Sequence, residues 1–314
     1  MNLLSAMYRG GVELRNYVYD RSLLESHRLA APVISVGSIS AGGAGKTPFV
    51  IMLGEMLRQR GLGFDVLSRG YGRKSRGARV VDSNGVAAEF GDEPLLIARR
   101  LECPVIVGES RFEAGKLAEQ QFVSQLHILD DGFQHRSLAR DFDIALLTQD
   151  DLKDRLLPSG RLREPLRSLR RADVIAFFDD AALDSLQLAG PAVWHVRRSL
   201  SLPEPPANPI AFCGIARPQN FLEQLKSAGV TPIVFKSYRD HHAYTEQDIR
   251  NLLALRDQNK AGGFITTEKD AVNLGSAIAQ LGEVTIARVT MDIAEPADAL
   301  DTMLRVIDER KVRA

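Results

Sequence analysis

The sequence predicts an α/β protein made of two linked α/β/α domains. Its 314 residues are enough for two domains of ordinary size. Short apolar runs alternate with helical segments along most of the chain, which is typical of parallel sheets with helices on both faces. The apolar run at residues 32–36 leads straight into a glycine-rich loop and then into a second apolar run at 49–53. This strand–loop–helix unit places the first parallel sheet near the N-terminus.

The elements of the first domain follow one another in a regular order. We expect strands at residues 32–36, 63–68, 104–107, 126–130 and 143–147, each of them short and apolar. Helices are expected directly after the glycine-rich loop and at residues 93–101 and 111–121. We place this domain at residues 1–150.

A second, smaller α/β domain is expected at residues 151–285. Its predicted strands are 173–178, 191–197, 209–214, 231–236 and 263–267, with helices near 217–228 and 245–256. It opens with the most basic segment of the chain, residues 151–173. A strand near 284–292 and a helix near 296–310 follow. The sequence leaves open whether residues 286–314 complete the second domain or return to the first.

The first 20 residues carry an amphipathic pattern, in which Leu4, Met7, Leu14 and Val18 recur at near-helical spacing with arginines between them. Such a pattern is typical of a helix in a membrane interface, and also of a helix packed on its own domain. The sequence contains no apolar run long enough to span a bilayer and no signal-peptide core. We therefore expect neither a membrane-spanning helix nor export.

The composition limits the classes of function. The 40 basic and 40 acidic side chains give zero formal charge, so no overall field attracts nucleic acid, and we expect no nucleic-acid partner. Cys103 and Cys213 lie in apolar runs without metal-ligand spacing, so we expect buried free thiols in a reducing cytoplasm. No feature of the sequence indicates an obligate protein partner.

The glycine-rich loop predicts a phosphate-binding site. It comprises Ser40, Ala41, Gly42, Gly43, Ala44, Gly45, Lys46 and Thr47. Glycines allow backbone N–H groups to converge on anionic oxygens, Lys46 is placed to reach the β- and γ-phosphates, and the Thr47 hydroxyl is placed to hold Mg²⁺. Ser40 stands where the usual pattern begins with glycine. A plain glycine-rich turn is the alternative, but the flanking strand and helix favour a loop that binds a nucleoside triphosphate.

Carboxylates at two further positions suit the same site. Asp130 and Asp131 end an apolar strand, where they are candidates for holding Mg²⁺, with a solvated Asp-Asp-Gly turn as the alternative. Asp92 and Glu93 lie at a loop-to-helix junction. Asp92 suits a base that orients a hydroxyl group for phosphoryl transfer. An ordinary helix cap explains this pair as well.

Histidines and arginines supply the remaining candidates. His241 and His242 follow Asp240 just before a predicted helix, and without a second cluster of His or Cys an Asp–His proton relay or an anion contact is favoured over zinc. Guanidinium groups suit phosphate, and four arginines accompany glycine-rich turns or the basic segment: Arg69, Arg73, Arg111 and Arg163. A solvated or salt-bridged role is the alternative for each of them.

Together, these motifs resemble one family, the tetraacyldisaccharide 4'-kinases of lipid A biosynthesis, which are membrane-associated cytoplasmic P-loop kinases. The resemblance spans most of the chain. It rests on the nucleotide loop and on eight further motifs in the family's order, at residues 32–37, 68–72, 91–94, 130–135, 162–165, 212–215, 240–244 and 266–270.

The resemblance implies an enzyme that transfers the γ-phosphate of ATP, with Mg²⁺, to the 4'-hydroxyl of a tetraacylated glucosamine disaccharide 1-phosphate, forming lipid IVA. The work would take place at the cytoplasmic face of the bacterial inner membrane, with peripheral attachment. The residues themselves leave two other functions open. These are a soluble P-loop kinase for another small molecule and a non-catalytic, nucleotide-switched binding protein.

The resemblance also implies roles for individual residues of the ATP site and the sugar site. The catalytic set would be Lys46, Asp92, and one histidine of the pair His241 and His242. Thr47, Glu93, Asp130 and Asp131 would organise the metal. The phosphate or sugar side of the substrate would contact Tyr71, Arg111, Gln134, His135 and Arg163.

Overall fold

The structure, a computed structural model, describes residues 3–178 and 190–313. Its strands are β1 (Val33–Ser38), β2 (Phe64–Ser68), β3 (Arg79–Val80), β4 (Val105–Val107), β5 (Leu126–Asp130), β6 (Phe142–Leu147), β7 (Val174–Phe177), β8 (Ala192–Ser201), β9 (Ile210–Cys213), β10 (Val234–Ser237), β11 (Phe264–Thr267) and β12 (Val284–Ile293). Within the described residues these twelve strands form one sheet, in the order β10-β9-β11-β12-β8-β7-β6-β1-β5-β2-β4-β3. The α/β fold class predicted from the sequence is confirmed.

Helices cover both faces of the sheet. They are α1 (Leu3–Asp20), α2 (Lys46–Gln59), α3 (Ala87–Phe90), α4 (Asp92–Leu101), α5 (Arg111–Gln121), α6 (Gln149–Lys153), α7 (Pro218–Ser227), α8 (Glu246–Asn259), α9 (Glu268–Leu274) and α10 (Pro296–Arg313), with 3-10 turns η1 (Leu166–Arg171) and η3 (Gly275–Leu281). Neighbouring residues of a strand face opposite sides. Ile128 therefore lies in the core under α2, α4 and α10, and Leu129 lies in the core under α5.

The strands β7-β6-β1-β5-β2-β4-β3 form the N-terminal part of the sheet. Their pairings are parallel except for the short edge strand β3. Every residue of β1, β2, β5, β6 and β7 is buried, as expected for strands covered on both faces. Because the strands are parallel, their carboxyl ends and the loops that follow them lie along one edge of the sheet.

The strands β10-β9-β11 form the C-terminal part of the sheet, and all of their pairings are parallel. One core packs α8 and η3 on this part through Phe212, Phe264 and Leu252, and another packs α7 on its opposite face through Phe221 and Leu225. This part is thus a second α/β/α sandwich.

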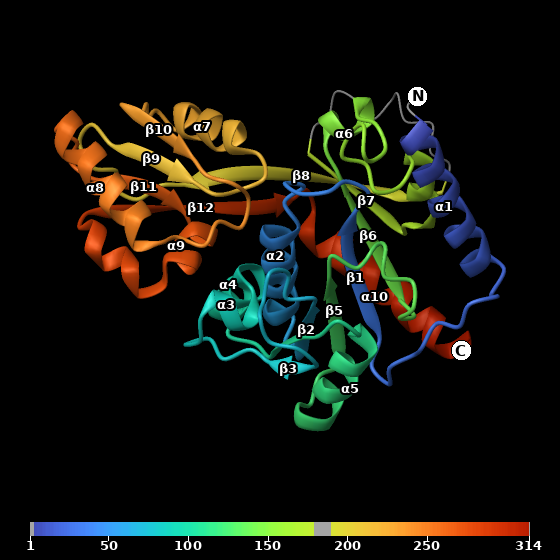
Figure 1. The fold of residues 1–314 in the computed structure, drawn as a ribbon. Helices are drawn as coiled ribbons and strands as arrows, with labels where there is room; N and C mark the ends of the chain where they lie inside the picture. The colour runs from blue at the N-terminus through green and yellow to red at the C-terminus, as the bar shows by residue number, and fades with distance from the viewer. Residues whose placement is uncertain (1–2, 179–189, 314) are drawn as a thin grey trace.

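Two long strands, β8 and β12, join the two parts. The start of β8 pairs in parallel with β7, and its end pairs antiparallel with β12, where Val196 lies opposite Ile293. The start of β12 pairs in parallel with β11. Figure 1 shows β8 and β12 running from one part of the molecule to the other.

Two strands differ from the expected grouping. The strands predicted at 173–178 and 191–197 were expected in the second domain, but β7 and the start of β8 continue the N-terminal part of the sheet. The chain end also returns there, because α10 contacts α2 and β6, and Arg310 pairs with Asp173 at 2.6 Å. The proposed division between residues 150 and 151 stays a prediction. The short elements β3, α3, α6, α9 and the two 3-10 turns lacked a sequence signal strong enough to predict them.

Helix α1 packs on its own protein through one face. Ser5 and Val12 are buried, and the Ser5 hydroxyl lies 2.6 Å from that of Ser159. Arg15 and Asn16 both donate hydrogen bonds to the fully buried carboxylate of Glu164, at 3.2 and 2.8 Å. The packed-helix interpretation is therefore correct for this face of the helix.

Glu164 also accepts hydrogen bonds from Arg171, at 2.9 and 3.2 Å. Burial raises the pKa of this carboxyl, but Arg171, Asn16 and Arg15 outweigh burial and hold the pKa below its ordinary value of 4.5. A carboxylate with a depressed pKa stabilises the fold above the ordinary pKa, and this stabilisation is lost as the pH falls through the folded-state value.

We expect Glu164→Gln to lower the free energy of unfolding by about 2–4 kcal/mol at neutral pH, because it leaves the partly buried guanidinium groups of Arg15 and Arg171 without their buried counterion. The difference from the wild type should shrink as the pH falls below about 4.5. Urea unfolding at several pH values measures it. The control is Glu13→Gln, since Glu13 makes exposed ion pairs with Arg9 and Arg167 and should matter little. A pH-independent loss in Glu164→Gln would contradict this account.

Candidate active site

The glycine-rich loop lies between β1 and α2, where the sequence predicts it. Helix α2 begins at Lys46, with Gly45 as its N-cap in a left-handed conformation at φ 82°. Gly42 and Gly43 also have positive φ, at 69° and 71°. Residues with a Cβ rarely adopt these angles, so glycine is required for the loop to curl its N–H groups inward at the helix N-terminus. The loop has the geometry of an anion cradle.

The two aspartates of the Asp-Asp-Gly motif lie next to this cradle because of strand register. Val36 of β1 pairs with Asp130 of β5, so the end of β5 lies beside the start of the loop. The Ser68 hydroxyl, at the end of β2, donates to Asp130 at 3.0 Å. Asp131 lies 3.4 Å from the Lys46 ammonium and accepts two hydrogen bonds from Arg163, at 3.0 and 2.8 Å.

These neighbours give the two carboxyls opposite tendencies. Burial, Glu93 and Asp131 together raise the pKa of Asp130 well above its ordinary range, against Lys46 and Ser68. Burial acts in the same direction on Asp131, but Lys46 and Arg163 outweigh it and hold the pKa of Asp131 well below its ordinary range. Within the described part of the chain, the buried Oδ1 atom of Asp130 accepts no hydrogen bond. This oxygen is placed to receive a cation.

The fit of these residues to Mg²⁺ depends on the nucleotide. Residues 3–178 and 190–313 contain no group of three or more His, Cys, Asp or Glu side chains arranged to hold a metal by themselves. Mg²⁺ commonly takes only one or two carboxylates and completes its shell with phosphate oxygens and water. Asp130 fits that pattern, and so does the buried Thr47 at the start of α2.

Asp92 lies at the start of α4 and is 4% exposed. Its two carboxylate oxygens are each 2.9 Å from Nδ1 of His241, and the Asn273 amide donates to one of them at 2.9 Å. The N-cap position of α4 is Gly91, so Asp92 is already inside the helix. The Glu93 N–H of the first turn nevertheless donates to the Asp92 carboxylate at 2.9 Å, so this side chain both satisfies the helix N-terminus and contacts His241.

A carboxylate, an ammonium group and an aromatic ring contact His241. Its Nε2 atom lies 3.2 Å from the Lys269 ammonium, and its ring lies 5.0 Å from that of Tyr71. An ammonium only donates, so the neutral ring accepts at Nε2 and carries its proton at Nδ1, toward Asp92. Burial lowers the pKa of His241, but the hydrogen bond to Asp92 outweighs it and gives a net rise.

Lys269 links four groups from both parts of the sheet. Besides His241, it contacts Glu93 at 3.2 Å, Asp240 at 3.4 Å and Asp92 at 3.9 Å. Burial lowers its pKa, but the charges of Glu93, Asp92 and Asp240 outweigh burial and raise the pKa above its ordinary value. For Asp92 too, burial raises the pKa, while His241 and Lys269 produce a net lowering. The Asp92 carboxylate is thus kept ionised.

His242 faces a different set of residues. Its Nε2 atom lies 3.1 Å from Asp248, and its ring stacks on Tyr238 at 4.6 Å and meets Tyr244 edge-on at 4.9 Å. These contacts belong to the packing of the C-terminal part of the sheet. Of the adjacent histidines, His241 is the one in contact with Asp92.

A cavity of about 570 Å³ lies between the two parts of the sheet. Its lining includes the cradle residues Ala41–Thr47 and, from the other candidates, Tyr71, Glu93, Asp130, Asp131, Arg163 and His241. Asp92 is not among the lining residues, but its partner His241 is. Among the residues that the structure describes, His242, Arg111, Gln134 and His135 do not line this cavity.

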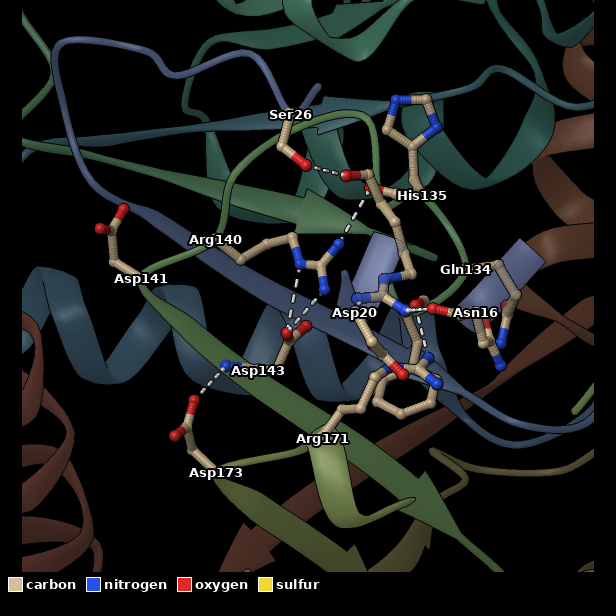
Figure 2. Close-up of polar contacts among 12 residues, drawn as sticks. Asn16, Asp20, Ser26, Gln134, His135, Arg140, Asp141, Asp143, Arg171 and Asp173 are labelled. Atoms are coloured by element: carbon tan, nitrogen blue, oxygen red, sulfur yellow. Dashed lines mark hydrogen bonds and ion pairs between the residues drawn. The ribbon is translucent and has the colours of Figure 1, made fainter. Parts of the chain in front are cut away.

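Gln134 and His135 lie behind the end of β1, in a polar network shown in Figure 2. Gln134 donates to the Ser38 carbonyl at 3.0 Å, and Arg140 donates to the His135 carbonyl at 3.2 Å while pairing with Asp143. Burial and the charges of Arg111, Arg140 and Arg69 lower the pKa of His135 to about 4. Burial also lowers the pKa of Arg111 to about 10.

Several residues of the site were not singled out from the sequence. Lys269 and Asn273 come from α9, and two arginines that line the cavity, Arg198 and Arg217, come from β8 and from the loop before α7. Lys269 lies in the motif at 266–270 that contributes to the family resemblance. Its position just after a predicted strand is the signal that could have marked it.

Comparison with known proteins agrees with this geometry. Residues 1–308 match the family model LpxK, tetraacyldisaccharide-1-P 4'-kinase. A tetraacyldisaccharide 4'-kinase of Koribacter versatilis is 46% identical over 321 residues, covering 99% of this chain and 100% of that protein. The chain belongs to this family. The fold class, the family resemblance and the kinase class predicted from the sequence are thereby confirmed.

A second relative and a solved structure both come from Aquifex aeolicus. The tetraacyldisaccharide 4'-kinase of Aquifex aeolicus is 36% identical over 287 residues, covering 86% of this chain and 88% of that protein. A crystal structure of LpxK from Aquifex aeolicus, described as an "apo" form in complex with ATP, matches with a TM-score of 0.77 and 32% identity, covering 97% of both chains.

The two adjacent histidines give a test of the site. We expect His241→Gln to lower kcat by about 10- to 100-fold, because Asp92 loses the group that orients it. We expect His242→Gln to lower the melting temperature while kcat changes little, because its contacts are with Tyr238, Tyr244 and Asp248. Steady-state kinetics and thermal unfolding of both variants measure this. The opposite ranking of the two kcat values would contradict the assignment of His241 to the site.

Proposed function

We propose that this protein transfers the γ-phosphate of ATP to the 4'-hydroxyl of a tetraacyldisaccharide 1-phosphate, giving lipid IVA for lipid A biosynthesis. One observation supports this above the rest. The nucleotide cradle and Asp92 come from the N-terminal part of the sheet, and His241, which contacts Asp92, reaches the cavity beside the cradle from the C-terminal part. The family supplies the substrate, since its relatives are tetraacyldisaccharide 4'-kinases.

The proposed mechanism assigns each residue a separate task. The cradle N–H groups and Lys46 bind the phosphates of ATP. Asp92, oriented by His241 and Asn273, accepts the proton of the 4'-hydroxyl. The hydroxyl oxygen forms a bond to the γ-phosphorus while the bond from that phosphorus to the β–γ bridging oxygen breaks, and ADP leaves. Phosphoryl transfer passes through a loose transition state, so orientation and charge stabilisation matter more than a strong base.

Mg²⁺ is part of the proposal, with Thr47, Asp130, Asp131 and Glu93 as the residues around it. When bound, the ion would neutralise charge on the β- and γ-phosphates. The unpaired Oδ1 of Asp130 supports a direct contact there. Lys46 and Arg163 already neutralise Asp131 within the described structure, which favours a role for Asp131 in orienting those two cations.

For the sugar and its 1-phosphate we propose Tyr71, Arg163, Arg111, Gln134 and His135. Tyr71 is 64% exposed and lines the cavity beside His241, where a sugar ring has room to approach. Gln134 donates to the Ser38 carbonyl at the end of β1, and Arg111 lies near enough to Asp130, Asp131 and His135 for their charges to interact. The lowered pKa of His135 makes it a neutral hydrogen-bonding group at pH 7.

We further propose peripheral attachment to the cytoplasmic face of the inner membrane through α1. Its outward face carries Leu3, Met7, Leu14 and Tyr17, which are 54–74% exposed. In the described part of the chain, no helix is long and apolar enough to cross a membrane. An apolar helix face beside arginines is the pattern of an interfacial helix. Figure 1 shows α1 along an outer edge of the N-terminal part.

The function is tested by measuring label transfer from γ-labelled ATP to a tetraacyldisaccharide 1-phosphate in detergent. We expect Asp92→Asn to lower kcat by about 10²–10⁴, since Asn cannot accept the proton, with ATP affinity and melting temperature nearly unchanged.

Lys46→Ala should lower kcat by at least about 10². Label in a polar metabolite but not in the lipid would favour a different kinase, and ATP binding without any transfer would favour a nucleotide switch. Near-normal kcat in Asp92→Asn would leave the base unidentified.

Membrane attachment is tested by flotation with vesicles that contain anionic lipid. We expect the triple variant Leu3→Ser, Met7→Ser, Leu14→Ser to lower the partition coefficient by at least about tenfold, because three apolar side chains no longer enter the interface. The matched control replaces three exposed valines elsewhere, Val86, Val123 and Val312, with Ser. Equal losses in the two triple variants, or none in either, would contradict attachment through α1.

A further inference from the structure

Arg198 of β8 reaches the nucleotide cradle from the strand that joins the two parts of the sheet. It lies opposite Met291 of β12 in the antiparallel ladder. A Cβ built on Gly45 would lie 2.5 Å from Nη2 of Arg198 and 2.6 Å from the Met291 methyl group. The guanidinium group therefore rests directly against the residue that precedes Lys46, and it lines the cavity.

The guanidinium group of Arg198 is buried with part of its hydrogen-bonding capacity unused. Both Nε and Nη2 are shielded from solvent, and neither meets a hydrogen-bond acceptor in the described structure. The face of the group lies over Phe178, at 4.8 Å from the ring centroid. A buried polar group without a partner destabilises a fold by about 1–3 kcal/mol, and more if it is charged. The unpaired Nε and Nη2 donors of Arg198 therefore favour the binding of an anionic ligand.

Four other cations that line the cavity have anionic partners, and Arg69, which also lines it, is exposed to solvent. Lys46 and Arg163 contact Asp131, and Lys269 contacts Glu93 and Asp240. Arg217 also presses on the cradle, 2.8 Å from the Cβ that Gly43 would carry, but it pairs with Asp150 and Asp151. The charge of Arg217 also disfavours the charged form of the nearby Arg198. Burial, and after it the charge of Arg217, lowers the pKa of Arg198.

We infer that Arg198 binds the α- and β-phosphates of the nucleotide, so that β8 supplies the cradle with a guanidinium donor that the loop motif itself lacks. This inference rests on the proposed use of ATP. The position beside Gly45 selects these phosphates, because the glycine N–H groups of such loops cradle the α- and β-phosphates, whereas the lysine reaches further toward the γ-phosphate. An incoming phosphate oxygen satisfies Nη2 and offsets the positive field of the two arginines.

The test is calorimetric titration of the full-length protein with ATP and with ADP. A charge-assisted hydrogen bond of this kind corresponds to about a 10- to 100-fold change in dissociation constant. We expect Arg198→Gln to weaken ATP and ADP by that factor and by similar amounts. The control is Arg197→Gln. Arg197 is exposed and lies on the opposite face of β8, so this variant loses the same charge but should bind both nucleotides as tightly as the wild type does.

Thermal unfolding distinguishes a binding role from a structural one. Without nucleotide, Arg198→Gln should melt no lower than the wild type, because a buried and incompletely paired charge is removed, while the rise in melting temperature on adding ADP should be smaller than in the wild type. Unchanged affinities for ATP and ADP would overturn the inference, whether or not the melting temperature falls. Weakening of ATP alone would overturn the assignment to the α- and β-phosphates. Failure of the wild type to bind ATP would instead contradict the proposed function.

Discussion

The pairing of β8 with β12 is the constraint on which the site depends. The start of β8 pairs with β7 of the N-terminal part, and the start of β12 pairs with β11 of the C-terminal part. The remaining lengths of β8 and β12 pair with each other. Backbone hydrogen bonds of a ladder fix both the spacing and the register of what they join. The loop after β10, which carries His241, and the helix α9, which carries Lys269, are thereby held against α4 of the other part.

Charged side chains make several of the contacts between α9 and α4. Arg100 pairs with Glu268 at 2.6 Å, and Lys269 lies among Asp92, Glu93 and Asp240. A hydrophobic seam of the same shape would stabilise the fold at least as well, since buried ion pairs often repay no more than their desolvation. The charges are better understood through the proposed function, because they keep Asp92 ionised and fix the tautomer of His241 at one wall of a cavity whose other wall is the glycine-rich cradle.

Two adjacent residues connect the nucleotide cradle with the first helix. Arg163 donates to Asp131 and to the Ser40 carbonyl, while Glu164 accepts from Arg15 and Asn16 of α1. The Tyr8 hydroxyl completes the link by donating to the Arg163 carbonyl at 3.1 Å. The basic segment therefore contributes mainly internal pairing at this point. A helix with an exposed apolar face and a nucleotide loop are tied to the same short stretch of chain.

Much of the fold could be predicted because it is written in local patterns. Buried parallel strands are short apolar runs, helices separate them, and the cradle needs glycine at positions of positive φ, so strands such as β1 and β5 and the helix starting at Lys46 were predicted to within a few residues. The carboxylates of Asp130 and Asp92 were marked in the same way, by their places at the end of a strand and the start of a helix.

What the sequence by itself determined is therefore the α/β class, the order of the elements, the cradle and the family. The tertiary structure decided which strands share a sheet, that His241 rather than His242 meets Asp92, and that Lys269, Asn273 and Arg198 belong to the site. The physical reason is sequence distance. The contacts of Asp92 with His241 and Asn273, and of Arg198 with Gly45, join residues about 150 or more positions apart, and no local periodicity encodes the long-range pairing of β8 with β12 that brings them together.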